Sequence, residues 1–186
     1  IPTLSGGTYA HPTAVSDGGL VAGDADDVDG NVRAFLWEAI GGTVHLGTLG
    51  GHESYAKAVN VNGWVAGTSL NEDGKKRAFL WTGADGMKDL GTLCTIGADP
   101  ECGDESEATG MNVAGQVSGW SKTAAGTEHA FLWTSAVGMV DLGALSETGN
   151  SRATAVNDLG QVSGVSAKTD GTVVAFVWLP ENGMTE

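Results

Sequence analysis

The sequence predicts an all-β fold, specifically a four-bladed β-propeller, and two observations carry this prediction. First, Gly accounts for 30 of the 186 residues and Pro for 4, while 41% of the residues are hydrophobic. This composition is typical of short strands joined by tight turns and not of a disordered chain. Second, the chain repeats itself about every 45 residues. That is the size of a four-stranded propeller blade.

The repeat is clearest in a five-residue motif whose Phe residues are 44, 52 and 45 positions apart. Its alternating apolar side chains predict the third strand of each blade, with Phe and Trp packed between neighbouring sheets. The copies are Arg33-Ala34-Phe35-Leu36-Trp37, Arg77-Ala78-Phe79-Leu80-Trp81, His129-Ala130-Phe131-Leu132-Trp133 and Val174-Ala175-Phe176-Val177-Trp178.

The other three strands of each blade follow from shorter repeated blocks. The first strand is a block such as Ala58-Val59-Asn60. It ends in a three-residue hairpin loop whose Gly takes the left-handed conformation. The second strand ends at a second hairpin that contains Gly, and the fourth strand is the Met-x-Asp-Leu-Gly block after the five-residue motif. The hairpin glycines are Gly19, Gly63, Gly115 and Gly160 in the first turn, and Gly30, Gly74, Gly126 and Gly171 in the second.

The repeat boundaries predict how the ring closes. We place the repeats at approximately residues 8–51, 52–95, 104–146 and 147–186, within a single domain of residues 1–186. The fourth repeat stops early, and residues 1–7 resemble residues 46–51. We therefore expect the N-terminal segment to complete the last blade. A β-prism, a β-solenoid and a strand-swapped larger propeller are alternatives with the same repeat.

The repeated blocks resemble those of the HAF-repeat family of bacterial extracellular proteins, which is named after its His-Ala-Phe core. His129-Ala130-Phe131 carries that core literally, and the segment from Asp89 to Leu93 matches a second recurring phrase. The resemblance covers nearly the whole chain. It implies a secreted or cell-surface protein with a propeller-like fold, and it supplies no catalytic residues to transfer.

The charge of the chain excludes some classes of partner. It has 23 acidic and 9 basic residues, a net charge of −14. Proteins that bind nucleic acid draw their affinity from Lys and Arg, so we expect no nucleic-acid partner. The same charge opposes docking on an anionic membrane, and no apolar run is long enough to insert into one.

The two cysteines, Cys94 and Cys102, both lie in the insertion that lengthens one repeat to 52 residues. An even count within one loop predicts a local disulfide in an oxidising compartment. A two-Cys metal site is the alternative, but no His lies at ligand spacing.

An acidic run suggests a calcium loop, but its spacing does not fit. Counting back from Gly30 puts Ala25 in the first ligand slot, so we interpret Asp24, Asp26, Asp27 and Asp29 as a solvated hairpin turn. We therefore expect no cofactor and no metal site, with weak Ca²⁺ binding as the alternative.

Divergence among equivalent positions points to candidate catalytic residues. Fourfold pseudosymmetry would bring His11, Tyr55, Glu107 and Arg152 to one ring near a channel mouth. Arg could neutralise a bound carboxylate, and His or Tyr could transfer a proton. The alternative is that these are ordinary variable residues at the entry to a strand.

Two tryptophans outside the five-residue motif are candidate binding residues. Trp64 stands where two other repeats have Gln, and Trp120 follows a repeat Gly. Aromatic side chains at partly exposed positions form stacking platforms for sugars, whereas the alternative is local packing.

Two functions are consistent with these observations. The first is an extracellular binding or scaffold module that presents one propeller face to a glycan, small-molecule or protein ligand. The second is a small lyase or hydrolase that acts on an acidic carbohydrate or another carboxylate at the channel mouth. The sequence contains none of the common motifs of hydrolases, zinc proteases or phosphate-binding loops, which favours the first function.

Overall fold

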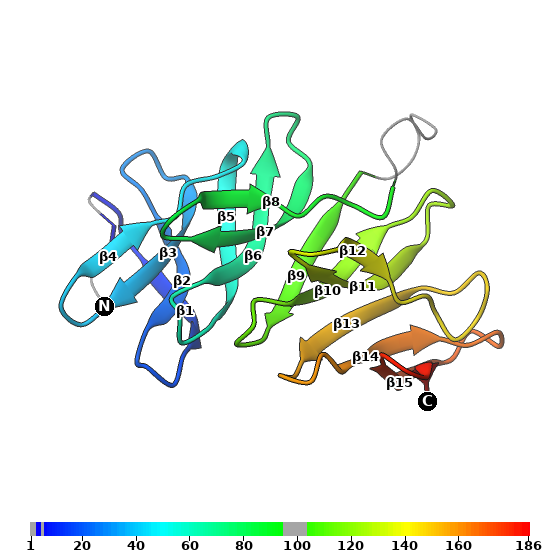
Figure 1. The fold of residues 1–186 in the computed structure, drawn as a ribbon. Helices are drawn as coiled ribbons and strands as arrows, with labels where there is room; N and C mark the ends of the chain where they lie inside the picture. Colours follow the sequence, from blue (N-terminus) through cyan, green and yellow to red (C-terminus); the bar gives the residue numbers. More distant parts are fainter. Residues whose placement is uncertain (1–2, 5, 95–103) are drawn as a thin grey trace. The chain divides into compact units, whose positions relative to one another are not determined.

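The computed structural model describes residues 3–4, 6–94 and 104–186, and these residues form strands and turns without a helix. The chain divides into two compact units, Ile1–Asp89 and Leu90–Glu186. Each unit contains two four-stranded antiparallel sheets made of consecutive strands (Figure 1). The all-β prediction with four sheets is therefore confirmed. No helix in the described part of the chain is long and apolar enough to span a membrane.

The first unit consists of one sheet in the order β1-β2-β3-β4 and a second in the order β5-β6-β7-β8. The strands are β1 (Ala10–Val15), β2 (Val21–Asp26), β3 (Val32–Glu38), β4 (Gly42–His45), β5 (Gly50–Val59), β6 (Val65–Asn71), β7 (Lys76–Thr82) and β8 (Gly86–Asp89).

The second unit repeats this arrangement in the orders β9-β10-β11-β12 and β13-β14-β15-β16. The strands are β9 (Ser106–Met111), β10 (Val117–Lys122), β11 (Glu128–Thr134), β12 (Gly138–Asp141), β13 (Ser151–Val156), β14 (Val162–Ala167), β15 (Val173–Leu179) and β16 (Gly183–Thr185). The five-residue motif lies in β3, β7, β11 and β15, as predicted.

The first hairpin of each sheet has the predicted left-handed Gly. In the second sheet, Gly63 has φ 74°, and its amide donates to the Asn60 carbonyl at 3.1 Å. The Asn60 side chain accepts from the amides of Asn62 and Trp64, which fixes the loop. The repeated Asn and Gly are thus both explained by the turn that they build.

Another repeated Gly is explained by packing. Gly119 in β10 lies under the ring of Phe131, and an added Cβ would stand 2.7 Å from that ring and closer still to the Glu107 carbonyl. The first strand of each sheet has a bulge beside this point, for example between Pro12 and Ala14. Only Gly allows the bulged strand and the Phe ring to approach the same backbone position. Its equivalents are Gly23, Gly67 and Gly164.

Within each unit the second sheet packs on the face of the first. In the first unit, Phe79 joins a buried cluster with Ala34 and Leu36 of the preceding sheet. In the second unit, Phe176 does the same with Ala130 and Leu132. Phe35, Phe79 and Phe131 are fully buried, as predicted for the motif. Trp133 is also buried, whereas Trp37, Trp81 and Trp178 are half-buried at the edges of these clusters.

A buried Ser joins the two sheets of each unit. The Ser54 hydroxyl in β5 accepts from the Ala34 amide at 2.9 Å and donates to the Gly47 carbonyl at 2.7 Å. In the second unit, Ser151 accepts from the Ala130 amide at 2.8 Å and donates to the Gly143 carbonyl. Each hydroxyl satisfies one donor and one acceptor that stacking removes from water.

The expectation that the N-terminal segment completes the last blade stays a prediction. The fourth sheet takes all of its strands, β13 to β16, from the last repeat, and no described residue before Ala10 lies in a strand. Leu4 is buried against Ala25 and Phe35 of the first sheet. Leu4 therefore lies where the chain enters the first sheet. Leu49 has the equivalent position at the second sheet, where its amide donates to the Ser69 hydroxyl.

Candidate functional site

The four candidate ring residues occupy equivalent positions in the first strands of their sheets. His11 pairs with Asp24, Tyr55 with Thr68, Glu107 with Trp120 and Arg152 with Val165 in the antiparallel registers. The sequence alignment of the repeats is therefore correct at these positions. His11 and Tyr55 belong to the first unit, and Glu107 and Arg152 belong to the second.

In the first unit, Tyr55 is the centre of a cluster of tyrosine and carboxylate side chains. Its hydroxyl donates to Glu53 at 2.9 Å. Burial, followed by that hydrogen bond and the charge of Glu53, raises the pKa of Tyr55 to about 12, with further contributions from Tyr9 and Asp24. Burial also raises the pKa of Tyr9, and so do the charges of Asp24, Asp26 and Glu53. Both hydroxyls thus face negative charge.

Asp24 is a nearly buried carboxylate of this cluster. Its side chain is 12% exposed, and the His11 ring nitrogen lies 3.7 Å from its oxygen. No described residue donates a hydrogen bond to the Asp24 carboxylate, which is unusual for a buried charge.

Asp26 holds Tyr9 in position. One carboxylate oxygen accepts from the amides of Thr8 and Tyr9, both at 2.7 Å, and the other accepts from the Thr8 hydroxyl at 2.6 Å. The Thr8 hydroxyl and the Tyr9 amide contribute most to lowering the pKa of Asp26. The carboxylate is thus engaged by the chain that carries Tyr9.

In the second unit, Arg152 is already paired within the protein. Its guanidinium donates to Glu128 at 2.7 Å and lies 4.4 Å from the centre of the Trp120 ring. Glu128 also pairs with Lys122 at 3.0 Å. Burial raises the pKa of Glu128, but hydrogen bonds and charge from Lys122 and Arg152 outweigh it and lower the pKa overall. A bound carboxylate would have to compete with Glu128 for Arg152.

The expected partial exposure of Trp120 is wrong. Trp120 is 7% exposed, because Arg152 from β13 lies over its ring. The sequence could not show this, since the covering side chain belongs to another sheet. Trp64 directly precedes β6, the second strand of its sheet. It is half-buried, which confirms the partial exposure expected at this position.

The acidic run that suggested a calcium loop is engaged by the protein itself. Asp27 accepts from the amides of Asp29 and Asn31, which closes the turn, and it pairs with Arg33 at 3.2 Å. Asp24 and Asp26 point into the tyrosine cluster described above. Among the residues that the structure describes, no group of three or more His, Cys, Asp or Glu side chains is arranged to hold a metal ion.

The repeated basic residue of the five-residue motif has a structural partner. His129 pairs with Asp141 at 2.9 Å and Arg77 with Asp89 at 3.4 Å, which joins the third strand to the fourth. In the first sheet His45 stands in the Asp position, and Arg33 turns to Asp27 instead.

The proposed disulfide between Cys94 and Cys102 cannot be placed, because Cys102 lies outside the described residues. It stays a prediction from the sequence.

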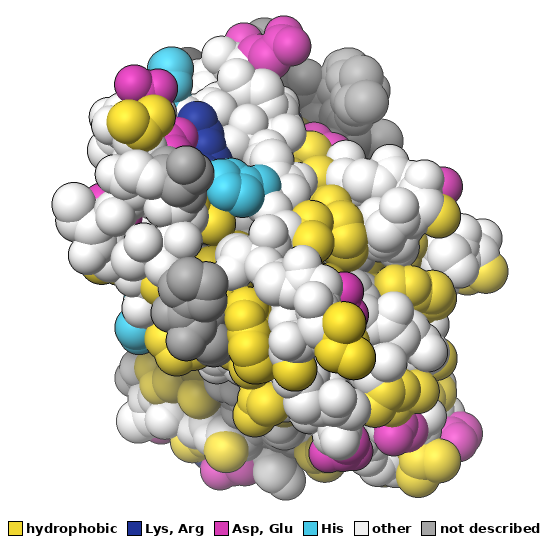
Figure 2. Space-filling view, turned by 90° about the vertical axis from the view of Figure 1, so that its left-hand side faces the viewer, with side chains coloured by type: hydrophobic (Ala, Val, Ile, Leu, Met, Phe, Trp, Pro, Cys, Tyr) yellow, Lys and Arg dark blue, Asp and Glu magenta, His cyan; other side chains and the backbone are white. Residues whose placement is uncertain are grey.

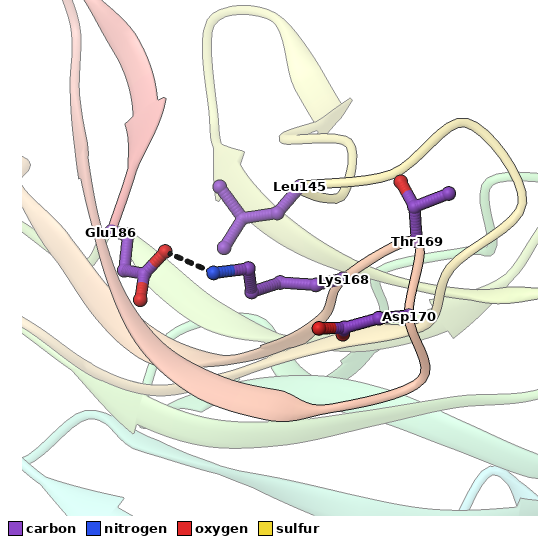
Figure 3. Close-up of a pocket in the computed structure, with 5 residues that line it drawn as sticks. All are labelled: Leu145, Lys168, Thr169, Asp170 and Glu186. Carbon is purple, nitrogen blue, oxygen red and sulfur yellow. Dashed lines mark hydrogen bonds and ion pairs between the residues drawn. The ribbon is translucent and has the colours of Figure 1, made fainter.

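An open hollow of about 310 Å³ lies in the second unit beside the hairpin that joins β14 to β15. Figure 3 shows Lys168 reaching across it to Glu186, with Leu145, Thr169 and Asp170 around them. The Lys168 ammonium donates to Glu186 at 2.9 Å, and this bond raises the pKa of Lys168. The one cation among the described lining residues is thus engaged.

The surface combines exposed apolar and acidic side chains. Figure 2 shows hydrophobic side chains across the middle of the face in view, with Asp and Glu mainly toward its upper and lower ends. Tyr9 is 40% exposed, so the tyrosine cluster of the first unit reaches solvent.

Sequence reasoning found His11 and Tyr55 and interpreted Asp24 as part of a solvated hairpin turn, but it missed Tyr9 and Glu53. The missing signal was alternation: Glu53 stands two residues before Tyr55 in β5, so the two share one face of that strand, and Tyr9 has the same spacing from His11, immediately before β1.

Comparison with models of known protein families and with curated proteins finds no match to this chain.

Proposed function

We propose that the chain is an extracellular binding or scaffold module of the propeller type, which presents one face to a glycan or protein ligand. The observation that carries the proposal is the tyrosine and carboxylate cluster of the first unit. Aromatic rings beside hydrogen-bonding carboxylates are the groups that bind sugars, because the rings pack on C–H faces and the carboxylates accept from hydroxyls.

Packing within the units supports a propeller arrangement. In the third sheet, Leu132 is 7% exposed and the Ala130 amide is bonded to Ser151 of the next sheet. In the fourth sheet, the equivalent Val177 is 40% exposed, and no described residue bonds the Ala175 amide from an adjacent sheet. A face of this kind calls for a further sheet to cover it, which the first sheet would do in a closed ring.

Hydrogen exchange tests the closed ring. We expect the Ala175 amide to be protected in dilute monomeric protein, because a covering first sheet would exclude water from it. Its protection should be weaker than that of the Ala130 amide, because the first sheet has Ala10 where Ser151 bonds Ala130. Free exchange at Ala175 beside a protected Ala130 would contradict a closed ring.

The catalytic alternative is less well supported by the same residues. Arg152 is paired with Glu128, so a carboxylate substrate would have to compete with Glu128 for it. The pKa of Tyr55 is about 12, which makes its phenolate scarce near neutral pH. We expect no unsaturated product when the protein is incubated with acidic polysaccharides.

Binding to glycans tests the main proposal. Affinity electrophoresis through gels that contain single soluble polysaccharides, neutral or amino-substituted, should retard the protein in at least one gel. Tyr55→Ala should raise the dissociation constant obtained from the retardation about tenfold, since it removes one ring and one hydroxyl. The matched control is Val137→Ala, at an exposed turn of the second unit. Equal migration in every gel would contradict a glycan ligand.

A further inference from the structure

We propose that Tyr9, Asp24, Glu53 and Tyr55 form a binding site for a protonated amine, so that the glycan taken by this module carries amino sugars. The inference rests on the proposed function, because it names the ligand class of the same face. The arrangement of charges in the first unit points to a cation, which the sequence motifs did not.

The first observation is a buried carboxylate that lacks hydrogen-bond donors. Asp24 is 9% exposed, and its one ion-pair neighbour among the described residues is His11 at 3.7 Å. Burying a carboxylate is costly unless donors or a cation compensate it. An ammonium group beside Asp24 would supply both charge and donors.

The second observation is the sign of the field around the tyrosines. Tyr9 and Tyr55 both feel the negative charges of Asp24 and Glu53, and Asp26 adds to the field at Tyr9. No Arg or Lys among the described residues pairs with Asp24 or Glu53. The site therefore attracts cations and repels carboxylates, whereas the rings offer faces for a cation–π contact.

The third observation is an internal precedent in the second unit. At the equivalent positions there, Arg152 replaces Tyr55 and Trp120 replaces Asp24. The Arg152 guanidinium stacks on Trp120 and pairs with Glu128, so the protein supplies its own cation to an aromatic ring beside a carboxylate. The first unit keeps the aromatic and acidic groups, but no Arg or Lys among its described residues takes the place of Arg152, and the basic neighbour of Asp24 is His11 at 3.7 Å.

The accessibility of the cluster fits a ligand that enters from solvent. Tyr9 is 40% exposed and the His11 side chain 68% exposed, whereas Asp24 lies deeper. An amine on a sugar could reach Asp24 with the sugar ring against Tyr9. Asp26, which holds the backbone of Thr8 and Tyr9, keeps that ring in place.

The test compares two oligosaccharides, one with free amines that can carry a proton and one in which N-acetylation makes every nitrogen neutral. Isothermal titration with a glucosamine tetramer and its fully N-acetylated counterpart should show at least tenfold tighter binding of the charged form at low salt. Asp24→Asn should lower the ratio of the two affinities about tenfold, and Glu53→Gln should lower this ratio as well. Glu147→Gln removes one exposed charge in the second unit and should change nothing.

The outcomes separate this inference from the proposed function. Equal affinity for the two tetramers, or equal effects of Asp24→Asn and Glu147→Gln, overturns the amine site while the glycan module stands. Binding of neither tetramer also overturns the amine site, and if neutral polysaccharides fail as well, the glycan function falls with it. Glu53→Gln gives the answer if Asp24→Asn does not fold, as judged by far-ultraviolet circular dichroism.

Discussion

Gly119→Ala should be among the most damaging single-methyl substitutions in the chain. The added Cβ would stand 2.7 Å and 2.8 Å from two carbons of the Phe131 ring, and the Glu107 carbonyl oxygen would be closer still. The carbonyl belongs to the backbone of β9 and cannot rotate away. Either β9 separates from β10 or the fully buried Phe131 ring leaves its site. Overpacking with loss of part of a Phe site costs about 3–5 kcal/mol.

Urea unfolding followed by tryptophan fluorescence measures this cost. The matched control is Gly83→Ala, because the nearest atom to an added Cβ there is a Trp81 ring carbon at 3.9 Å. We expect the control to change the free energy of unfolding by less than about 0.5 kcal/mol. A loss of less than about 1 kcal/mol in Gly119→Ala would refute the explanation of this repeated Gly.

Three further predictions concern named contacts. Arg152→Ala should lower the free energy of unfolding by about 1 kcal/mol in urea titrations and expose Trp120 to a fluorescence quencher, because the half-exposed guanidinium covers that ring; an unchanged quenching rate would contradict it. The pKa of Asp26 is lower in the folded state, so its stabilisation is present above its unfolded pKa of 3.8 and lost as pH falls through the folded value. Asp26→Asn should therefore flatten the acid limb of the stability curve, and parallel limbs would argue against this. In a spectrophotometric titration, both phenolates should form above the usual pKa of 10.0, that of Tyr55 near pH 12, and Tyr55→Phe should remove the step near pH 12; persistence of that step in Tyr55→Phe would exclude the assignment.

Local features of the fold could be read from the sequence because their causes are local. The hairpin glycines, the Asn that closes the first turn and the apolar alternation around Phe35 all act within a few residues. The buried Phe of each motif followed from the same alternation, so the strands and their order within each sheet were predictable.

Features that depend on contacts between sheets were not predictable. Trp120 appeared exposed because nothing in its own strand reveals that Arg152 covers it. Residues 1–7 resemble the end of a repeat, but the sequence did not show that Leu4 is buried on the first sheet. The two tyrosines whose pKa the charge of Asp24 raises were not predictable either. Tyr55 comes from the next sheet, and Tyr9 comes from the segment before β1.

Each sheet is a meander of four consecutive strands that exchanges no strand with another repeat. Duplication or deletion of one whole repeat in the gene would therefore add or remove a complete sheet without cutting an existing ladder. The inter-sheet serines, such as Ser54 and Ser151, come with the repeat that carries them, whereas the first sheet has Ala10 at that position. The number of repeats in such a chain can therefore change by simple recombination. The first repeat would be the least suited to duplication, because its Ala10 offers no hydroxyl to the sheet before it.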